Sequence, residues 1–257
     1  MTTLEEQPDM KSFSTSLGQV HVLGKEALFV ETMRLIKNAL KNTDGEVAVG
    51  LTGGSTPKAF YAWAAKHQAL SSELKERVVW STSDERCVPE SDDNSNFGHA
   101  NRDMLQPLDV PELNKFPWPV ELDPEACADE FNHRWNERFG PSHCFDICFL
   151  GMGGDNHTAS LFPNCPLIGT QHHENFAAIN WPERGWRVTI TPEGFSRCKL
   201  IVVSVTGEGK EEALFQAFHG EFNPRHKPIQ LLKAHSHKVL WLLDPAAATG
   251  LDLDMGV

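Results

Sequence analysis

An acidic residue and a histidine stand two apart in GMGGDNH, residues 151–157, which follows the apolar run FDICFL. Asp155 and His157 can do proton-transfer chemistry, because a carboxylate can orient an imidazole that acts as a general base. The glycines of this segment allow a close approach of backbone to a ligand. The dinucleotide fingerprint G-x-G-x-x-G is incomplete, since Asn156 occupies its last position. The pattern favours a general base, and a loop with two ordinary polar residues is the alternative.

A second glycine pair, in TGGSTP at residues 52–57, indicates an anion site. Gly53 and Gly54 permit close backbone approach, and Ser55 or Thr56 can cap a helix that begins here. The N-terminus of a helix presents N–H groups that bind anions such as phosphate. The P-loop spacing G-x-x-x-x-G-K-[ST] is absent from this segment. A capped turn without a ligand is the alternative.

Two further segments carry cations. Lys210 ends TGEGK, residues 206–210, where a helix is expected to begin. A lysine at this end opposes the helix dipole, so a bound anion would explain it, and a solvated surface lysine is the alternative. Arg187 heads the apolar segment GWRVTIT, residues 185–191.

A third cation, Arg86, lies in SDERCVP, residues 83–89. Its planar guanidinium suits a bidentate contact with a carboxylate or phosphate, oriented by Asp84 or Glu85. A local salt bridge with these two acids is the alternative. The chain has no G-x-S-x-G nucleophile elbow, so water is the expected nucleophile of a hydrolytic reaction.

Short apolar strands alternate with glycine-containing turns and amphipathic helices. The expected strands are 46–51, 77–83, 145–150, 199–205 and 237–244, and the expected helices are 25–42, 58–67, 124–140, 157–162 and 211–220. The strands are continuous apolar runs, which predicts a mostly parallel sheet with helices on both faces. The fold class is therefore a three-layer open α/β sheet of Rossmann-like type. Ligands bind beyond the carboxyl ends of such strands, so all four loops are expected to face one crevice.

The chain of 257 residues is expected to form one domain, with a flexible N-terminus over 1–15 and a loop-rich portion near 160–190. Its net charge of −12 argues against a nucleic-acid partner. No apolar run approaches the roughly 20 residues of a membrane helix, and the acidic N-terminus does not resemble a secretory signal. The six cysteines are therefore expected to be free thiols of a cytoplasmic protein, and no metal site is expected.

Four segments resemble the 6-phosphogluconolactonase family, within a wider group that includes the glucosamine-6-phosphate isomerases and deaminases. They are LTGGSTPKAFY, DERCVPESDDNSNFGHA, FDICFLGMGGDNHTASLFP and LLKAHSHKVLWLLDPAAA. The similarity runs in order over about residues 20–250, which is nearly the whole chain. The deaminases typically carry M-D-E-Y where this chain has SDERC, and this favours the lactonases.

The resemblance implies hydrolysis of 6-phospho-D-glucono-1,5-lactone in the pentose phosphate pathway, without metal or cofactor. His157 resembles the family's general base and Asp155 its neighbouring acid. The residues that resemble its substrate-anion contacts are Gly53, Gly54, Ser55, Thr56, Arg86, Arg187 and Lys210. We expect Arg86 or Arg187 to stabilise the developing oxyanion, and Asp84 to belong to the substrate-binding site.

This sequence departs from the family's loop, which commonly reads G-M-G-x-D-G-H, at two positions. Asn156 replaces the last glycine, and asparagine tolerates left-handed backbone better than most residues, so activity is expected to be retained. Gly154 stands where many members have Glu or Pro, and this position is expected to be permissive.

Two other functions stay open from the sequence: an amino-sugar-phosphate isomerase or deaminase, and a non-catalytic sugar-phosphate-binding protein. In each reading the partner is a small sugar phosphate, with no membrane or nucleic acid involved. The protein is expected to be a monomer or a weak homo-oligomer.

Overall fold

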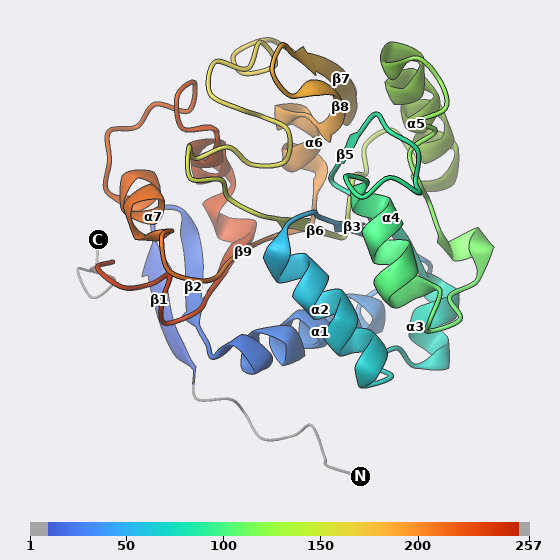
Figure 1. The fold of residues 1–257 in the computed structure, drawn as a ribbon, viewed down its shortest axis with the longest axis horizontal. Helices are drawn as coiled ribbons and strands as arrows, with labels where there is room; N and C mark the ends of the chain where they lie inside the picture. Colours follow the sequence, from blue (N-terminus) through green and yellow to red (C-terminus); the bar gives the residue numbers. More distant parts are fainter. Residues whose placement is uncertain (1–9, 252–257) are drawn as a thin grey trace.

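A seven-stranded sheet in the order β1-β2-β10-β9-β6-β3-β4 forms the centre of the computed structural model, which describes residues 10–251 (Figure 1). From β2 to β4 every neighbouring pair is parallel, and only β1 runs antiparallel to its neighbour. The strands are β1 (Lys11–Thr15), β2 (Gly18–Val22), β3 (Val47–Leu51), β4 (Val78–Thr82), β6 (Ile147–Leu150), β9 (Leu200–Val205) and β10 (Val239–Leu243). The predicted open, mostly parallel sheet is confirmed.

The N-terminal prediction was wrong for residues 11–15. This segment forms β1, which pairs with β2 over its whole length, from Lys11 opposite Val22 to Thr15 opposite Gly18. Residues 1–9 of the predicted flexible end lie outside the described residues.

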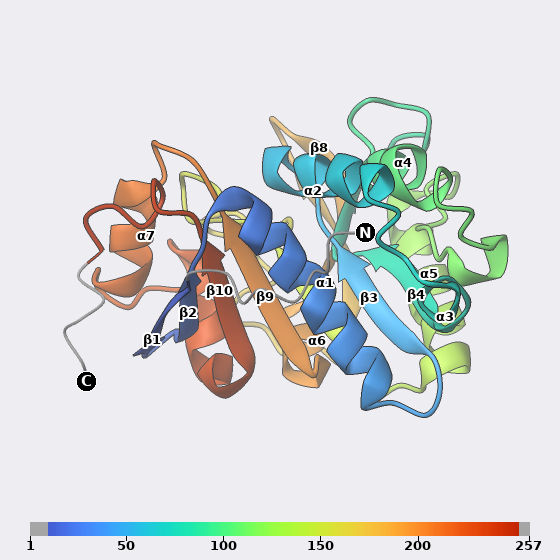
Figure 2. The same ribbon diagram turned by 90° about the horizontal axis from the view of Figure 1, so that it is seen from below.

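Helices cover both faces of the sheet, and Figure 2 shows α1 lying across one of them. On this face pack α1 (Lys25–Lys41), α2 (Ser55–Lys66), α3 (Ser72–Arg77), α4 (Asn96–Ala100) and the π-helical turn η1 (Asn101–Leu105). On the other face pack α5 (Pro124–Phe139), α6 (Pro192–Arg197), α7 (Glu211–Phe218) and the 3₁₀ segment η3 (Pro228–Lys238). A short 3₁₀ turn, η2 (Glu112–Asn114), precedes α5. No helix within residues 10–251 is long and apolar enough to cross a membrane.

The two faces explain why the strands are apolar at consecutive positions. Along β9, Ile201 and Val203 belong to the core beneath α5 and α7, while Val202 between them belongs to the core beneath α1. Successive side chains of a strand point to opposite faces, so a strand covered on both sides needs apolar residues at both. Five of the six cysteines are buried, and none is paired with another in the described chain.

A second sheet packs against α5, on the face of the central sheet that α5, α6 and α7 cover (Figure 1). It is antiparallel, in the order β5-β8-β7, with β5 (Asp84–Arg86), β7 (Phe176–Trp181) and β8 (Gly185–Ile190). The expected loop-rich portion near 160–190 is thus correct only up to residue 175, because residues 176–190 form a hairpin of two strands.

The helix expected over residues 157–162 is absent from the structure. Asn156 and Ala159 have φ angles of 63° and 46°, and Thr158 and Leu161 form an isolated antiparallel bridge. Left-handed backbone at two positions three apart cannot continue into a right-handed helix. The chain after β6 therefore forms a compact loop, which carries His157.

The order of the central strands places a crevice at one end of the sheet. After β3 the chain moves outward to β4, but the later strands β6, β9 and β10 lie on the opposite side of β3. The loops after β3 and β6 therefore diverge at a topological switch point, which is where open α/β sheets bind ligands.

Candidate active site

The loops that follow β3, β4, β6 and β9 line one pocket, as the sequence predicted. Eight of the ten predicted site residues line it: Gly53, Gly54, Ser55, Thr56, Asp84, Arg86, His157 and Lys210. The other two, Asp155 and Arg187, lie directly behind members of this set. The wall also contains Asn96, Ala159 and Ser204, which sequence reasoning missed.

Asp155 and His157 form a hydrogen-bonded pair. The Nδ1 atom of His157 lies 2.5 Å from Oδ1 of Asp155, and the His157 backbone N–H donates to the same oxygen at 3.2 Å. A carboxylate only accepts, so we assign the ring proton to Nδ1, which leaves Nε2 as the basic nitrogen. Burial raises the pKa of Asp155, but the hydrogen bonds and charge of His157 outweigh it and place this pKa below its ordinary value. The pair can accept a proton at Nε2 and stabilise the resulting imidazolium.

The side chains around this pair hold the ring in place. Phe162 packs on the His157 ring, with 4.3 Å between the ring centroids. The guanidinium of Arg184 lies over the Phe162 ring, with its Cζ atom 4.2 Å from the ring centroid. Its Nη2 is 3.6 Å from Oδ2 of Asp155. Arg184 lies in the loop between β7 and β8. It belongs to no recognisable motif, so the sequence offers no reason to place it near the site.

The glycine before the pair has a steric role. A Cβ atom at Gly153 would overlap the His157 ring and lie 2.6 Å from Oδ1 of Asp155. At Gly154, by contrast, a Cβ would meet nothing within 4 Å, as expected for a permissive position. Asn156 adopts a φ of 63°, a left-handed conformation that asparagine tolerates better than most residues, at the position where the family's loop commonly has glycine. Position 153 therefore needs a residue without a Cβ atom, so that the His157 ring can lie against the backbone. Position 156 needs a residue that tolerates a positive φ.

Arg86 has neutral oxygen atoms as its partners. Its Nη1 donates to the backbone carbonyl of Asn94 at 2.6 Å and to Oδ1 of Asn96 at 2.8 Å. The Asn96 amide in turn donates to the carbonyl oxygen of Asp84 at 2.9 Å. These contacts take the place of the local salt bridge that is the alternative interpretation, and within residues 10–251 no carboxylate forms an ion pair with Arg86, which lines the pocket.

Glu85 orients Arg86 through the backbone. Its carboxylate accepts the backbone N–H groups of Arg86, Asn96 and Phe97 at 2.7–2.8 Å, and the Ser95 hydroxyl at 3.1 Å. Burial raises the pKa of Glu85 to about 7, although the three backbone hydrogen bonds act to lower it. The carboxyl group thus ties the strand that carries Arg86 to the start of α4.

Asp84 lines the pocket from the same strand. Its Oδ2 accepts the hydroxyl proton of Ser160 at 2.7 Å, and its Oδ1 lies 3.3 Å from the Asn96 amide nitrogen. These contacts join the loop after β4 to the loop after β6, so Asp84 holds two walls of the pocket together.

Arg187 lies beside Arg86 but is not part of the pocket lining. The two residues are register partners across β5 and β8, and Nη1 of Arg187 donates to the carbonyl of Trp186 at 3.1 Å. Burial lowers the pKa of Arg187, and the charge of Arg86 lowers it further. Of the two cations predicted at this position, Arg86 is the one placed to contact a ligand directly.

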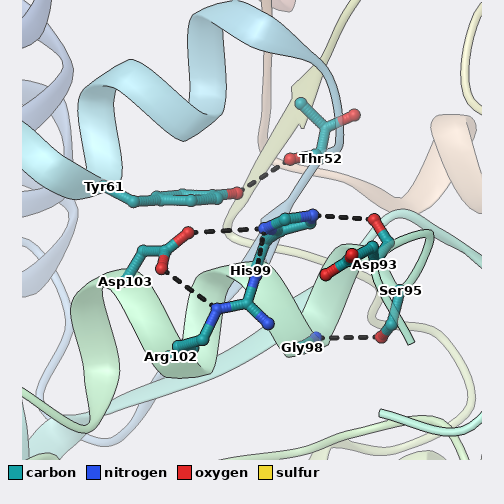
Figure 3. Close-up of polar contacts among 8 residues, drawn as sticks. All are labelled: Thr52, Tyr61, Asp93, Ser95, Gly98, His99, Arg102 and Asp103. Atoms are coloured by element: carbon teal, nitrogen blue, oxygen red, sulfur yellow. Dashed lines mark hydrogen bonds and ion pairs between the residues drawn. The ribbon is translucent and has the colours of Figure 1, made fainter. Parts of the chain in front are cut away.

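The prediction that Ser55 or Thr56 caps α2 was wrong. The N-cap is Gly54, with a φ of 109°, and no side chain within the described chain caps this end. Ser55 and Thr56 both line the pocket, and the Thr56 hydroxyl is hydrogen-bonded to the Thr206 hydroxyl, with 2.6 Å between the two Oγ1 atoms. Tyr61 braces the loop from below, since its buried hydroxyl donates to the Thr52 carbonyl at 2.8 Å (Figure 3).

Lys210 reaches across the pocket from the start of α7. It is the N-cap residue of that helix, and its Nζ donates to the Met152 carbonyl at 2.9 Å. A cation, a glycine-capped helix N-terminus and two hydroxyl groups thus line the same pocket, a combination that suits a phosphate group. Asp155, His157 and Arg86 lie in the loops of the neighbouring strands.

Most of the chain is similar in sequence to known proteins of one family. Residues 25–241 match the family described as glucosamine-6-phosphate isomerases/6-phosphogluconolactonase. The chain is 33% identical over 235 residues to a 6-phosphogluconolactonase of Synechocystis sp., covering 90% of this chain and 94% of that protein. It is also 33% identical over 214 residues to the human GDH/6PGL endoplasmic bifunctional protein, covering 80% of this chain and 26% of that longer protein.

Solved structures show the same fold. A 6-phosphogluconolactonase from Trypanosoma cruzi superposes with a TM-score of 0.79 at 24% identity, covering 95% of this chain and 99% of that one. The strand order, the loops that meet at the switch point and the sequence match over residues 25–241 agree with one another. The chain therefore belongs to the glucosamine-6-phosphate isomerase/6-phosphogluconolactonase family.

Proposed function

We propose that this protein hydrolyses 6-phospho-D-glucono-1,5-lactone to 6-phospho-D-gluconate, a reaction of the pentose phosphate pathway. Its relatives named 6-phosphogluconolactonase support this assignment. In the structure, the observation that carries it is the Asp155–His157 pair, which opens into the same pocket as Arg86 and Lys210. A base and two cations in one pocket suit a substrate that has both an ester carbonyl and a phosphate.

In the proposed mechanism, Nε2 of His157 removes a proton from a water molecule as the water oxygen attacks C1 of the lactone. Asp155 stabilises the imidazolium that forms, and Arg86 stabilises the negative charge that develops on the carbonyl oxygen. The bond between C1 and the ring oxygen then breaks, and His157 returns its proton to that oxygen. The product is an open-chain acid, and the mechanism requires no metal or cofactor.

The phosphate group is assigned to the start of α2 and to Lys210. Gly53, Gly54, Ser55 and Thr56 at the start of α2 offer backbone N–H groups and hydroxyls, and Lys210 offers a charge. Arg187 contributes through its charge behind Arg86.

We further propose a cytoplasmic location, which is supported by six cysteines without a disulfide in the described chain. The predicted oligomeric state, a monomer or a weak homo-oligomer, stays a prediction that sedimentation of the purified protein can measure.

A parallel assay of the two family reactions tests the proposed function. Purified protein is supplied with the lactone, after subtraction of spontaneous opening, and separately with glucosamine 6-phosphate. We expect lactone turnover without ammonia release. Ammonia release alone would make the protein a deaminase, and thermal stabilisation by 6-phosphogluconate without any turnover would make it a binding protein.

Lys210→Ala is expected to raise KM about tenfold or more, because charge-assisted hydrogen bonds contribute about 1.5–3 kcal/mol. Steady-state kinetics measure the change, and circular dichroism checks the fold. Lys58→Ala is the matched control, since Lys58 is exposed on α2 and lies outside the pocket lining. Unchanged KM and kcat in the Lys210 variant would contradict the phosphate assignment.

Arg86→Lys is expected to lower kcat/KM at least tenfold. A lysine has one compact charge, so it cannot bond the Asn94 carbonyl and the Asn96 side chain and still present a planar fork to the substrate. Kinetics at saturating and limiting lactone separate an effect on the transition state from one on binding. A kcat/KM close to that of the wild type would leave Arg86 with a structural role only.

A further inference from the structure

His99 forms a polar cluster beside the active site that the mechanism above does not use (Figure 3). Its side chain is 12% exposed and projects from α4. Nε2 lies 2.8 Å from the backbone carbonyl of Asp93, while Nδ1 lies 2.7 Å from Nη2 of Arg102 and 3.4 Å from Oδ2 of Asp103. Each ring nitrogen therefore has a partner.

The partners define the tautomer of His99. A carbonyl oxygen only accepts, so the nitrogen that faces Asp93 carries the proton. Arg102 only donates, so Nδ1 accepts from it, and Asp103 in turn accepts from Nε of Arg102 at 3.3 Å. The ring is thus fixed on the side of η1 by an arginine–aspartate pair, and it presents one N–H group to the loop that precedes α4.

The N–H group of His99 holds the peptide plane that joins Asp93 to Asn94. The carbonyl of Asp93 and the N–H of Asn94 belong to this peptide, and that N–H donates to Oδ1 of Asp92 at 2.7 Å. Asp93 and Asn94 are both exposed, and the other contacts of this turn are with Asp92: the Asn94 side-chain amide donates to its Oδ1 at 2.9 Å and the Ser95 N–H to its carbonyl at 3.0 Å. The next carbonyl along the chain, that of Asn94, accepts the hydrogen bond from Nη1 of Arg86.

We propose that His99 is a positioning residue for the reaction: it anchors the Asp93 carbonyl and thereby fixes the Asn94 carbonyl that orients Arg86. The effect on catalysis rests on the proposed function. The contact between His99 and the Asp93 carbonyl is independent of it. Loss of the anchor leaves the 93–94 peptide to its contacts with Asp92, and the Asn94 carbonyl is then held less firmly against Arg86. Because Arg86 is assigned to the developing oxyanion, the loss is expected in kcat more than in KM.

Two substitutions at position 99 separate anchoring from packing. In His99→Gln the side-chain amide nitrogen lies at about the reach of Nε2 and can still donate to the Asp93 carbonyl, whereas His99→Leu fills space without a donor. We expect the leucine variant to lose about tenfold in kcat with KM changed less than twofold, and the glutamine variant to retain at least half of kcat. His133→Leu is the matched control, because His133 forms the same i,i+4 pair with an acid, Glu137, on α5.

A double-mutant cycle tests whether the effect passes through Arg86. In an Arg86→Ala background there is no guanidinium to orient, so His99→Leu is expected to lower kcat less than twofold further. Equal losses from His99→Leu in both backgrounds would overturn the proposal, as would equal kcat values for the leucine and glutamine variants.

Amide exchange and the guanidinium signals of Arg86, both measured by NMR, supply readouts that need no turnover. The leucine variant is expected to speed exchange of the Asn94 amide at least tenfold and to shift the Arg86 signals, while the glutamine and His133 variants leave both unchanged. Unchanged exchange or unchanged Arg86 signals in the leucine variant would overturn the inference. A wild-type protein without lactone turnover would refute the proposed function instead, and these two readouts would then decide the inference alone.

Discussion

His157→Asn is expected to lower kcat by about 10²–10⁴-fold, the usual contribution of a general base, and to leave the fold and ligand binding intact. The ring is replaced by an amide that cannot accept the proton of the attacking water. His157 lies at the pocket wall and its side chain is 28% exposed, so the packing lost in the variant is mainly that against the Phe162 ring. Initial rates of lactone hydrolysis measure the effect, with spontaneous opening subtracted at each pH.

Three further observations belong to this prediction. Asp155→Asn is expected to lower kcat as well, because an amide does not stabilise the imidazolium as a carboxylate does. The wild-type rate is expected to fall on acidification, since a protonated ring cannot accept a proton. Calorimetric binding of 6-phosphogluconate is the control for an intact pocket. Full kcat in a folded His157→Asn variant would show that this histidine is structural.

Gly153→Ala is expected to lower kcat about 10²-fold, because the added Cβ would overlap the His157 ring and press on Asp155. Relief of this overlap requires the ring to move, and a displacement of about 1 Å in a catalytic group can cost about 10²-fold in rate. The effect should appear in kcat, with 6-phosphogluconate still bound, because no residue assigned to the phosphate group is substituted.

The neighbouring glycine supplies the control for this prediction. Gly154→Ala makes the same chemical change one residue later, where the added Cβ meets nothing within 4 Å, and it is expected to keep the wild-type rate. A pair of variants with equal kcat would show that the tight approach at Gly153 has no catalytic consequence.

Much of the central sheet could be predicted from the sequence, because burial on both faces leaves a local mark. The five predicted strands of continuous apolar residues all occur, as β3, β4, β6, β9 and β10. The glycine-containing turns that follow β3, β6 and β9, and the glycine-free segment SDERCVP that follows β4, lead into the pocket. A glycine indicates a flexible backbone at its own position, and an apolar run indicates burial of its own residues. Both can be interpreted without knowing which residues pack against them.

The failures arose where local patterns were incomplete or misleading. The segment 157–162 has an apolar pattern compatible with a helix, but left-handed backbone at Asn156 and Ala159 bends it into a loop. Strand β5 is short and entirely polar, and it exists because it pairs with β8, about a hundred residues later in the chain. Neither the bend nor the pairing is encoded in the periodicity of the segment itself.

The fold class and the loops that line the pocket could be predicted from local sequence patterns, and Asp155, His157 and Lys210 could be named as candidate site residues. The way those loops interlock is visible only in the folded chain, because Asn96, Ser160 and His99 are ordinary polar residues until their partners are known. Asp84 binds Ser160 across 76 positions, and Thr56 meets Thr206 across 150. A hydrogen bond depends on distance and direction between atoms, and packing of the whole sheet brings such distant atoms together.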